Sequence, residues 1–139
     1  MKTLKLMLAA LAVMFIAVNA KADVKPTKLT KTDVVNMYID AIAHGKTAGV
    51  DAIFDSDLQY NIKRGDNVST MDKDQVVSYL KGMPTDNQTV TTDQMVMQES
   101  DEASVIKLTF KFADYTRTDV LTISSGNGWQ ITNVTSSTK

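Results

Sequence analysis

Apolar side chains recur at helical spacing in the part of the chain that follows residue 29. One apolar face is formed by Val34, Met37, Tyr38, Ala41 and Ile42. Their intervals of three and four residues predict an amphipathic helix. Thr30 and Asp33 have the spacing of a capping box, and Gly45 suits the far end of a helix. We therefore predict a first helix that starts at Thr30 and ends at Gly45.

Two further helices are predicted before the midpoint of the domain. The shorter one starts near Thr47, and its apolar stripe consists of Val50, Ile53, Phe54 and Leu58. The longer one starts near Asp72, where Gln75 holds the capping-box position, and ends at Gly82. Its buried face consists of Val76, Tyr79, Leu80 and Met83.

The second half of the chain alternates apolar and polar residues, which is typical of strands. The clearest strand is predicted over residues 103–113, where Ile106, Leu108, Phe110 and Phe112 alternate with Val105, Lys107, Thr109 and Lys111. This period of two indicates a sheet with one buried face and one solvated face. Further strands are predicted over residues 89–98, 116–124 and 129–135, with a hairpin turn at 125–128.

Helices followed by strands favour an α+β fold. We expect a cone-shaped domain in which a strongly curved antiparallel sheet wraps around about three N-terminal helices. Residues 59–64 are typical of an extended segment, and they end in the turn 65–67. The domain is predicted to span residues 30–136.

The N-terminus has the three parts of an export signal. Lys2 and Lys5 are cationic, and the uncharged apolar stretch 6–18 is shorter than the roughly 20 residues that a membrane-spanning helix needs. Ala20 and Ala22 provide the small residues that a signal peptidase recognises. We expect cleavage after Ala22 and an exported, periplasmic or secreted protein.

Cleavage would divide the chain into a signal peptide of residues 1–22, a flexible leader of residues 23–29 and the domain. Three of the lysines would be lost with the signal, so the mature protein is more acidic than the whole chain, whose net charge is −1. An acidic domain without a basic stripe argues against nucleic acid as a partner. The sequence has no second apolar segment that could enter a membrane, so we expect no membrane contact after cleavage. The chain has no cysteine, so its stability must come from the core.

Two parts of the sequence resemble one known superfamily. Residues 34–45 and 50–57 combine a helix carrying a tyrosine, a small-residue turn and a phenylalanine followed by acidic residues. Residues 119–123 and 127–131 combine a strand, an Asn-Gly turn and a Trp-Gln-Ile strand. They are similar to the opening and the final hairpin of nuclear transport factor 2-like domains, especially the branch called SnoaL-like or "putative lumazine-binding". The resemblance implies a cone with an apolar pocket at its mouth.

The resemblance also allows the residues of an enzyme of this superfamily, ketosteroid isomerase, to be compared with this chain. That enzyme uses a tyrosine and a protonated aspartate as hydrogen-bond donors to an oxyanion, with a second carboxylate as the base. Tyr38 and Asp119 match the two donor positions. The base position, counted from Phe54, falls on Ile62, which cannot move a proton. The resemblance therefore implies an incomplete catalytic set.

Tyr38 and Asp119 also have structural interpretations. Tyr38 lies on an apolar helix face, where a half-buried core tyrosine is common. Asp119 shares a strand face with apolar residues, where an unpaired carboxylate is costly. Asp119 is either a neutral acid in a pocket or the partner of Arg117, two residues earlier on the same face. His44, the only histidine, is expected to be a surface or capping residue at a helix end.

We expect neither a metal nor a cofactor, because one histidine and no cysteine do not form the usual zinc sets. The preferred function is binding of a small apolar or heteroaromatic ligand, or of a partner protein, without catalysis. The predicted pocket consists of Tyr38, Ile42, Phe54, Tyr60, Ile62, Phe110, Asp119 and Trp129. The alternative is a lyase or isomerase that acts through Tyr38 and Asp119. A third hypothesis is a homodimer formed through the outer sheet face, which carries Val105, Lys107, Thr109 and Lys111.

Overall fold

The computed structural model describes residues 28–83, 89–126 and 128–139. The predicted export signal lies outside the described residues, as do residues 23–27 of the predicted leader. In chain order the elements are α2 (Lys31–His44), the 3₁₀ turn η1 (Val50–Ile53), β1 (Phe54–Arg64), β2 (Asn67–Met71), α3 (Lys73–Lys81), β3 (Thr91–Glu99), β4 (Ala103–Lys111), β5 (Thr116–Gly126) and β6 (Gly128–Thr138).

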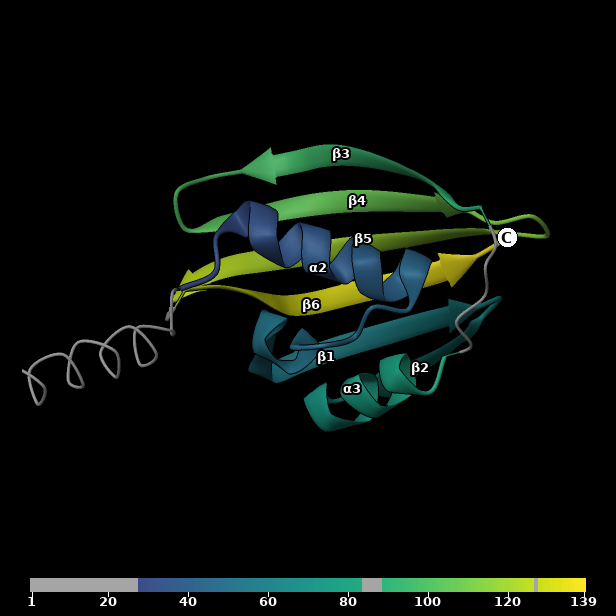
Figure 1. Cartoon of the computed structure of the whole chain (residues 1–139), viewed down its shortest axis with the longest axis horizontal. Helices are drawn as coiled ribbons and strands as arrows, with labels where there is room; N and C mark the ends of the chain where they lie inside the picture. The colour runs from purple at the N-terminus through teal and green to yellow at the C-terminus, as the bar shows by residue number, and fades with distance from the viewer. Residues whose placement is uncertain (1–27, 84–88, 127) are drawn as a thin grey trace, which may run out of the picture.

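Six strands form one curved sheet in the order β2-β1-β6-β5-β4-β3 (Figure 1). Neighbouring strands run antiparallel except β1 and β6, which are parallel. The expected α+β architecture is present, but the prediction of a wholly antiparallel sheet is wrong. α2 crosses the sheet in front of β5 and β6, and α3 lies against β1 and β2 (Figure 1). One face of the sheet is therefore covered by helices.

The helix ends follow from their capping residues. Thr30 and Asp33 form the predicted capping box of α2, and Gly45 closes the helix in the left-handed conformation with φ 65°. Asp72 and Gln75 form the second capping box, at the start of α3. Both long helices therefore begin and end close to the predicted residues.

The prediction of a second helix that starts near Thr47 is wrong. Only Val50–Ile53 form a turn, and Phe54 already belongs to β1. The strand has a register shift between Phe54 and Gln59 where it pairs with β6. Phe54 and Leu58 are buried four residues apart on one strand face, and the exposed polar Ser56 lies between them, so their spacing imitates a helical stripe. The fold thus has two α-helices among the described residues, rather than three.

The core lies between the helices and the inner face of the sheet. Along β4 and β5 every second side chain is buried, as the alternation predicts. The largest fully buried side chains of the core include Tyr38, Tyr60, Phe54, Phe110 and Leu121. Within the described part of the chain, no helix has the length and apolar character needed to cross a membrane.

Candidate functional site

Four polar side chains meet inside this core. Tyr38 comes from α2, Tyr60 from β1, and Arg117 and Asp119 from β5. Both tyrosines and Asp119 have 0% of their surface exposed, and Arg117 has 6%. Buried polar groups are costly unless they are paired, so their hydrogen bonds decide what they can do.

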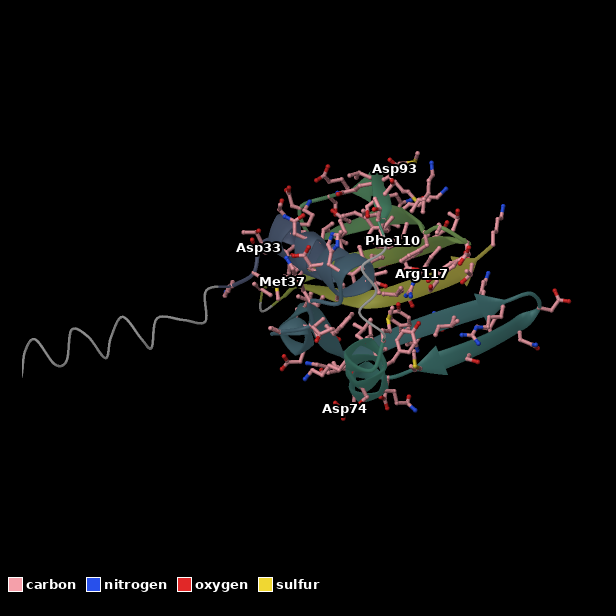
Figure 2. The ribbon with its side chains drawn as sticks, turned by 45° about the vertical axis from the view of Figure 1, so that its right-hand side comes forward. Asp33, Met37, Asp74, Asp93, Phe110 and Arg117 are labelled. Carbon is pink, nitrogen blue, oxygen red and sulfur yellow. The ribbon has the colours of Figure 1, made fainter. Side chains whose placement is uncertain are left out.

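Local structure explains why these residues point inward. Tyr38 lies on the apolar face of α2 that was predicted from its spacing. Arg117 and Asp119 occupy two consecutive inward positions of β5, where Leu121 and Ile123 continue the same face. Arg117 lies directly opposite Phe110 of β4 in the strand register, and both are labelled in Figure 2.

The four side chains form a closed ring of hydrogen bonds. Arg117 Nε donates to both carboxylate oxygens of Asp119, at 3.0 and 3.1 Å, and Arg117 Nη2 donates to the hydroxyl of Tyr60. The hydroxyls of Tyr38 and Tyr60 are 2.7 Å apart. The hydroxyl of Tyr38 donates to Asp119 Oδ2 at 2.6 Å. We call Tyr38, Tyr60, Arg117 and Asp119 the polar ring.

The direction of each hydrogen bond in the polar ring follows from the donors available. The guanidinium can only donate and the ionised carboxylate can only accept. Tyr38 gives its single proton to Asp119, so the proton between the two hydroxyls must come from Tyr60. Tyr60 in turn accepts from Arg117. Every hydroxyl proton of the ring is therefore used within the ring.

Burial and charge stabilise the neutral form of both tyrosines. Burial raises the pKa of Tyr38 well above its usual range, and the nearby charge of Asp119 raises it further. The pKa of Tyr60 is raised for the same two reasons, against the lowering effect of Arg117. For Arg117, burial alone would lower the pKa, but Tyr60, Tyr38 and Asp119 raise it. The guanidinium stays charged and paired.

A fifth polar side chain extends the ring toward α3. Arg117 Nη1 donates to the hydroxyl of Tyr79, which is half-buried, at a distance of 3.4 Å. Of the five N–H groups of a guanidinium, three then have partners among the described residues. Two N–H groups of Arg117 are left to bind another acceptor.

The sequence of residues 27–135 matches the protein family described as "Putative lumazine-binding". This chain belongs to that family. No curated protein sequence matches it.

Solved structures with the same fold have very different sequences. A nuclear transport factor 2-like protein of unknown function from Silicibacter pomeroyi is similar with 15% identity and a TM-score of 0.62, over 78% of this chain and 92% of that one. One from Methylobacillus flagellatus has 18% identity and a TM-score of 0.63, over 78% and 88%. A "putative ketosteroid isomerase" from Parabacteroides distasonis has 16% identity and a TM-score of 0.56, over 75% and 83%. These likenesses confirm the fold.

In this member of the family, the predicted pocket residues occupy four kinds of position. Tyr38, Tyr60 and Asp119 meet in the polar ring. The buried apolar members are Ile42, Phe54 and Phe110. Ile62 is half-buried on β1 and lies opposite Ser136, whose other neighbour in the register is Asp119. Trp129 lies elsewhere, and the centre of its ring is 4.8 Å from Lys31 Nζ.

The sequence left the partner of Asp119 open, and the structure decides for Arg117. The roles of Tyr60 and Tyr79 in binding Arg117 were missed. The sequence signal for Tyr60 is its spacing of two residues from Leu58, which places both side chains on the inner face of the strand. This spacing does not show that a cation lies next to the Tyr60 hydroxyl. His44 ends α2 and is exposed, as expected. Among the described residues, no three His, Asp or Glu side chains gather to hold a metal ion.

Proposed function

We propose that the domain binds a small apolar or heteroaromatic ligand without transforming it. The polar ring carries this proposal, because its hydroxyl protons are already used between Tyr38, Tyr60 and Asp119. The description of the family as lumazine-binding supports a heteroaromatic ligand.

The same geometry disfavours the alternative isomerase or lyase. Such an enzyme needs Tyr38 and a neutral Asp119 to donate hydrogen bonds to a developing oxyanion. Here Tyr38 donates to Asp119, and Asp119 accepts from Arg117 as an ion-paired carboxylate. The neighbouring inward position that would hold a base is the apolar Ile62. Neither oxyanion donor nor base is available.

Arg117 is the group of this site that can still bind a ligand. Its two remaining N–H groups suit the carbonyl oxygens of a heteroaromatic ring or a carboxylate. The hydroxyl of Tyr79 lies beside it, and the fully buried Phe110 is its direct neighbour on β4. A ligand that enters beside α3 would therefore meet the N–H donors of Arg117 and the hydroxyl of Tyr79.

Lumazine itself is the probe for this proposal. Titration of the purified protein with lumazine, followed by calorimetry, should show saturable binding at one site. Tyr79→Phe removes only a half-buried hydroxyl, and should weaken binding about 5- to 10-fold, as expected for one hydrogen bond. Tyr115→Phe is the matched control, because Tyr115 is 42% exposed and outside the ring.

Two results would contradict this function. One is the absence of lumazine binding together with the absence of any co-purifying small molecule in native mass spectrometry. The other is isomerisation of a β,γ-unsaturated ketone that Tyr38→Phe abolishes while the variant stays folded.

The export of the protein is proposed from the sequence. Intact-mass measurement of the protein secreted or released from the periplasm of its own host should give a chain that begins at Asp23. A chain that keeps residues 1–22 would contradict it.

We also propose, from the sequence, a homodimer through the outer sheet face. Light scattering coupled to size exclusion should then give twice the mass of the mature chain, and Thr109→Glu should reduce it to the monomer mass, because like charges would face each other across the symmetry axis.

A further inference from the structure

β3 is an edge strand that ends the strand order of the sheet. Among the described residues it pairs only with β4, and its outer side has no neighbouring strand. Met95, Val96 and Met97 have 60%, 50% and 53% of their surface exposed. Edge strands are usually protected by lysine, proline or a covering segment, and β3 contains neither residue type. Among the described residues, its protective features are a register shift between Val96 and Gln98 and the charges of Asp93 and Glu99.

Two hollows flank the second half of β3. The first, of about 210 Å³, lies between α2 and β3 and has Val35, Val96 and Ile106 as its apolar lining. The rest of its lining is polar or charged and consists of Lys31, Thr32, Asn36, Gln94 and Glu99. Val96 belongs on this inner side because it pairs with the buried Ile106. A strand added along β3 would place every second side chain over this hollow.

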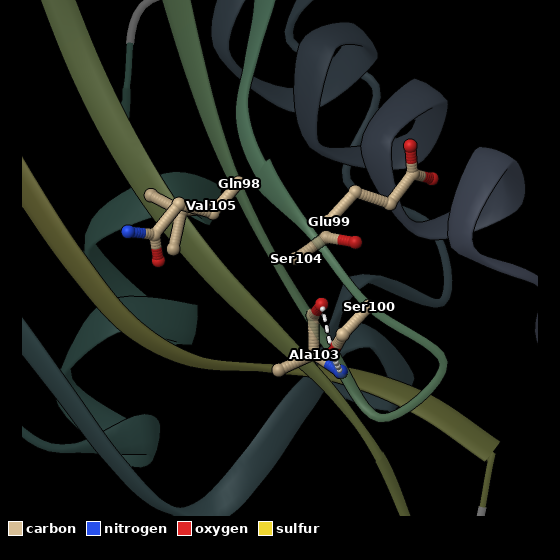
Figure 3. Close-up of a pocket in the computed structure, with 6 residues that line it drawn as sticks. All are labelled: Gln98, Glu99, Ser100, Ala103, Ser104 and Val105. Atoms are coloured by element: carbon tan, nitrogen blue, oxygen red, sulfur yellow. Dashed lines mark hydrogen bonds between the residues drawn. The ribbon is translucent and has the colours of Figure 1, made fainter.

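The second hollow, of about 400 Å³, lies at the end of the β3–β4 hairpin (Figure 3). It is lined by Gln98, Glu99, Ser100, Ala103, Ser104 and Val105. Glu99 lines both hollows.

The charge at this edge is acidic. Asp93 and Glu99 are the only charged residues of β3, and the adjacent turn adds Asp101 and Glu102. Among the described residues, Glu99 pairs with Lys31 at 2.7 Å and Asp93 pairs with Lys111 at 3.7 Å, whereas Asp101 and Glu102 form no ion pair. A second copy of this edge would bring the same four carboxylates, and its Lys31 and Lys111 would already be paired. A strand that carries lysine or arginine complements it better.

We propose that the β3 edge binds an extended segment of a partner protein, with apolar residues at alternate positions and basic residues between or beside them. Main-chain hydrogen bonds to β3 would supply affinity, the hollow next to Val96 would take an apolar side chain, and the carboxylates near Glu99 would take a cation. This surface is independent of the ligand site, since none of the polar-ring residues lines either hollow.

A labelled peptide of alternating valine and lysine is the probe. Fluorescence anisotropy should show that it binds at least about 10-fold more tightly than the same peptide with glutamate in place of lysine, and that added salt narrows the difference. Amide shifts in two-dimensional NMR should concentrate on β3 and the adjacent turn.

Matched substitutions on the two edges of the sheet test the location. Val96→Lys should reduce binding at least about 10-fold, because it adds a second cation to the hollow that Lys31 already lines, next to a bound cationic strand. Val68→Lys is the control, since Val68 has similar exposure, 55%, on the opposite edge strand β2. Circular dichroism verifies that both variants fold.

The proposal is overturned if the lysine and glutamate peptides bind equally, if both valine variants bind like the unaltered protein, or if the amide shifts lie away from β3. It is also overturned if light scattering shows a dimer that Val96→Lys dissociates, because the occupant of the edge is then a second copy.

Discussion

Every buried side-chain nitrogen and oxygen in the described core has a hydrogen-bond partner, whereas apolar side chains on the β3 edge are open to solvent. The two regions each contain an aspartate next to a cation on the sheet. Arg117 and Asp119 have side chains that are 7% and 0% exposed, and Lys111 and Asp93 have side chains that are 59% and 65% exposed. Their separations are 3.0 and 3.7 Å. The difference teaches that burial, more than pairing, decides how much each aspartate matters.

The largest expected effect is the loss of the buried carboxylate. Asp119→Ala leaves Arg117 charged and unpaired in the core, and should lower the free energy of unfolding by about 3–5 kcal/mol. Asp93→Ala should change it by less than about 1 kcal/mol, because an exposed pair is screened by water. Urea denaturation of both variants measures the difference. Equal effects would contradict the comparison.

A second pair of substitutions compares apolar neighbours. Val96 and Ile106 are directly opposite each other on β3 and β4, yet only Ile106 is buried, with 2% of its surface exposed. Ile106→Ala should cost about 2–5 kcal/mol of unfolding free energy, and Val96→Ala less than about 1 kcal/mol. A large loss from Val96→Ala in the isolated domain would mean that β3 is covered by a second copy in solution.

Removing one hydroxyl from the polar ring should have an intermediate effect. Tyr38→Phe leaves Asp119 without one donor and Tyr60 without its acceptor. The expected loss is about 1–3 kcal/mol of unfolding free energy. Tyr115→Phe, at a site that is 42% exposed, should have almost no effect. Thermal or urea unfolding distinguishes the two, and a neutral Tyr38→Phe would show that the ring is not a stabilising unit.

A further effect is confined to alkaline pH. The pKa values of Tyr38 and Tyr60 are raised in the folded state, so the unfolded chain loses these protons first, near pH 10. The stability that these two tyrosines contribute should be fully present below about pH 10. Above pH 10 the free energy of unfolding should fall by about 1.4 kcal/mol per pH unit for each tyrosine. Unfolding measured from pH 8 to 11 should show this slope, and Tyr60→Phe should halve it. An unchanged slope in that variant would contradict the assignment.

The sequence allowed the parts of the fold that depend on local signals to be predicted. Capping residues such as Thr30 and Asp72 act within one helical turn, and the alternation in β4 reflects one buried face. β2 was missed because its residues are almost all exposed and carry no alternation. The parallel pairing of β1 with β6 joins residues far apart in the chain, and no local pattern encodes it.

The candidate site was predictable to the same degree. Arg117 and Asp119 share one strand face, so their pairing was one of the two alternatives that the sequence left open for Asp119. Tyr60 and Tyr79 reach Arg117 from β1 and α3, and this convergence depends on tertiary packing. The same face of β1 was misleading near its start, since Phe54 and Leu58 are four residues apart with the polar Ser56 between them, and this spacing also fits a helix.

The account depends most directly on the claim that the protons of the polar ring are used within it. Proton NMR at neutral pH can detect the hydroxyl protons of Tyr38 and Tyr60 if they exchange slowly with water. We predict two such resonances at low field, one of which disappears in Tyr60→Phe while the other shifts. Hydroxyl protons that exchange as fast as that of Tyr115 would mean that the ring is open, and that Tyr38 can donate to a substrate.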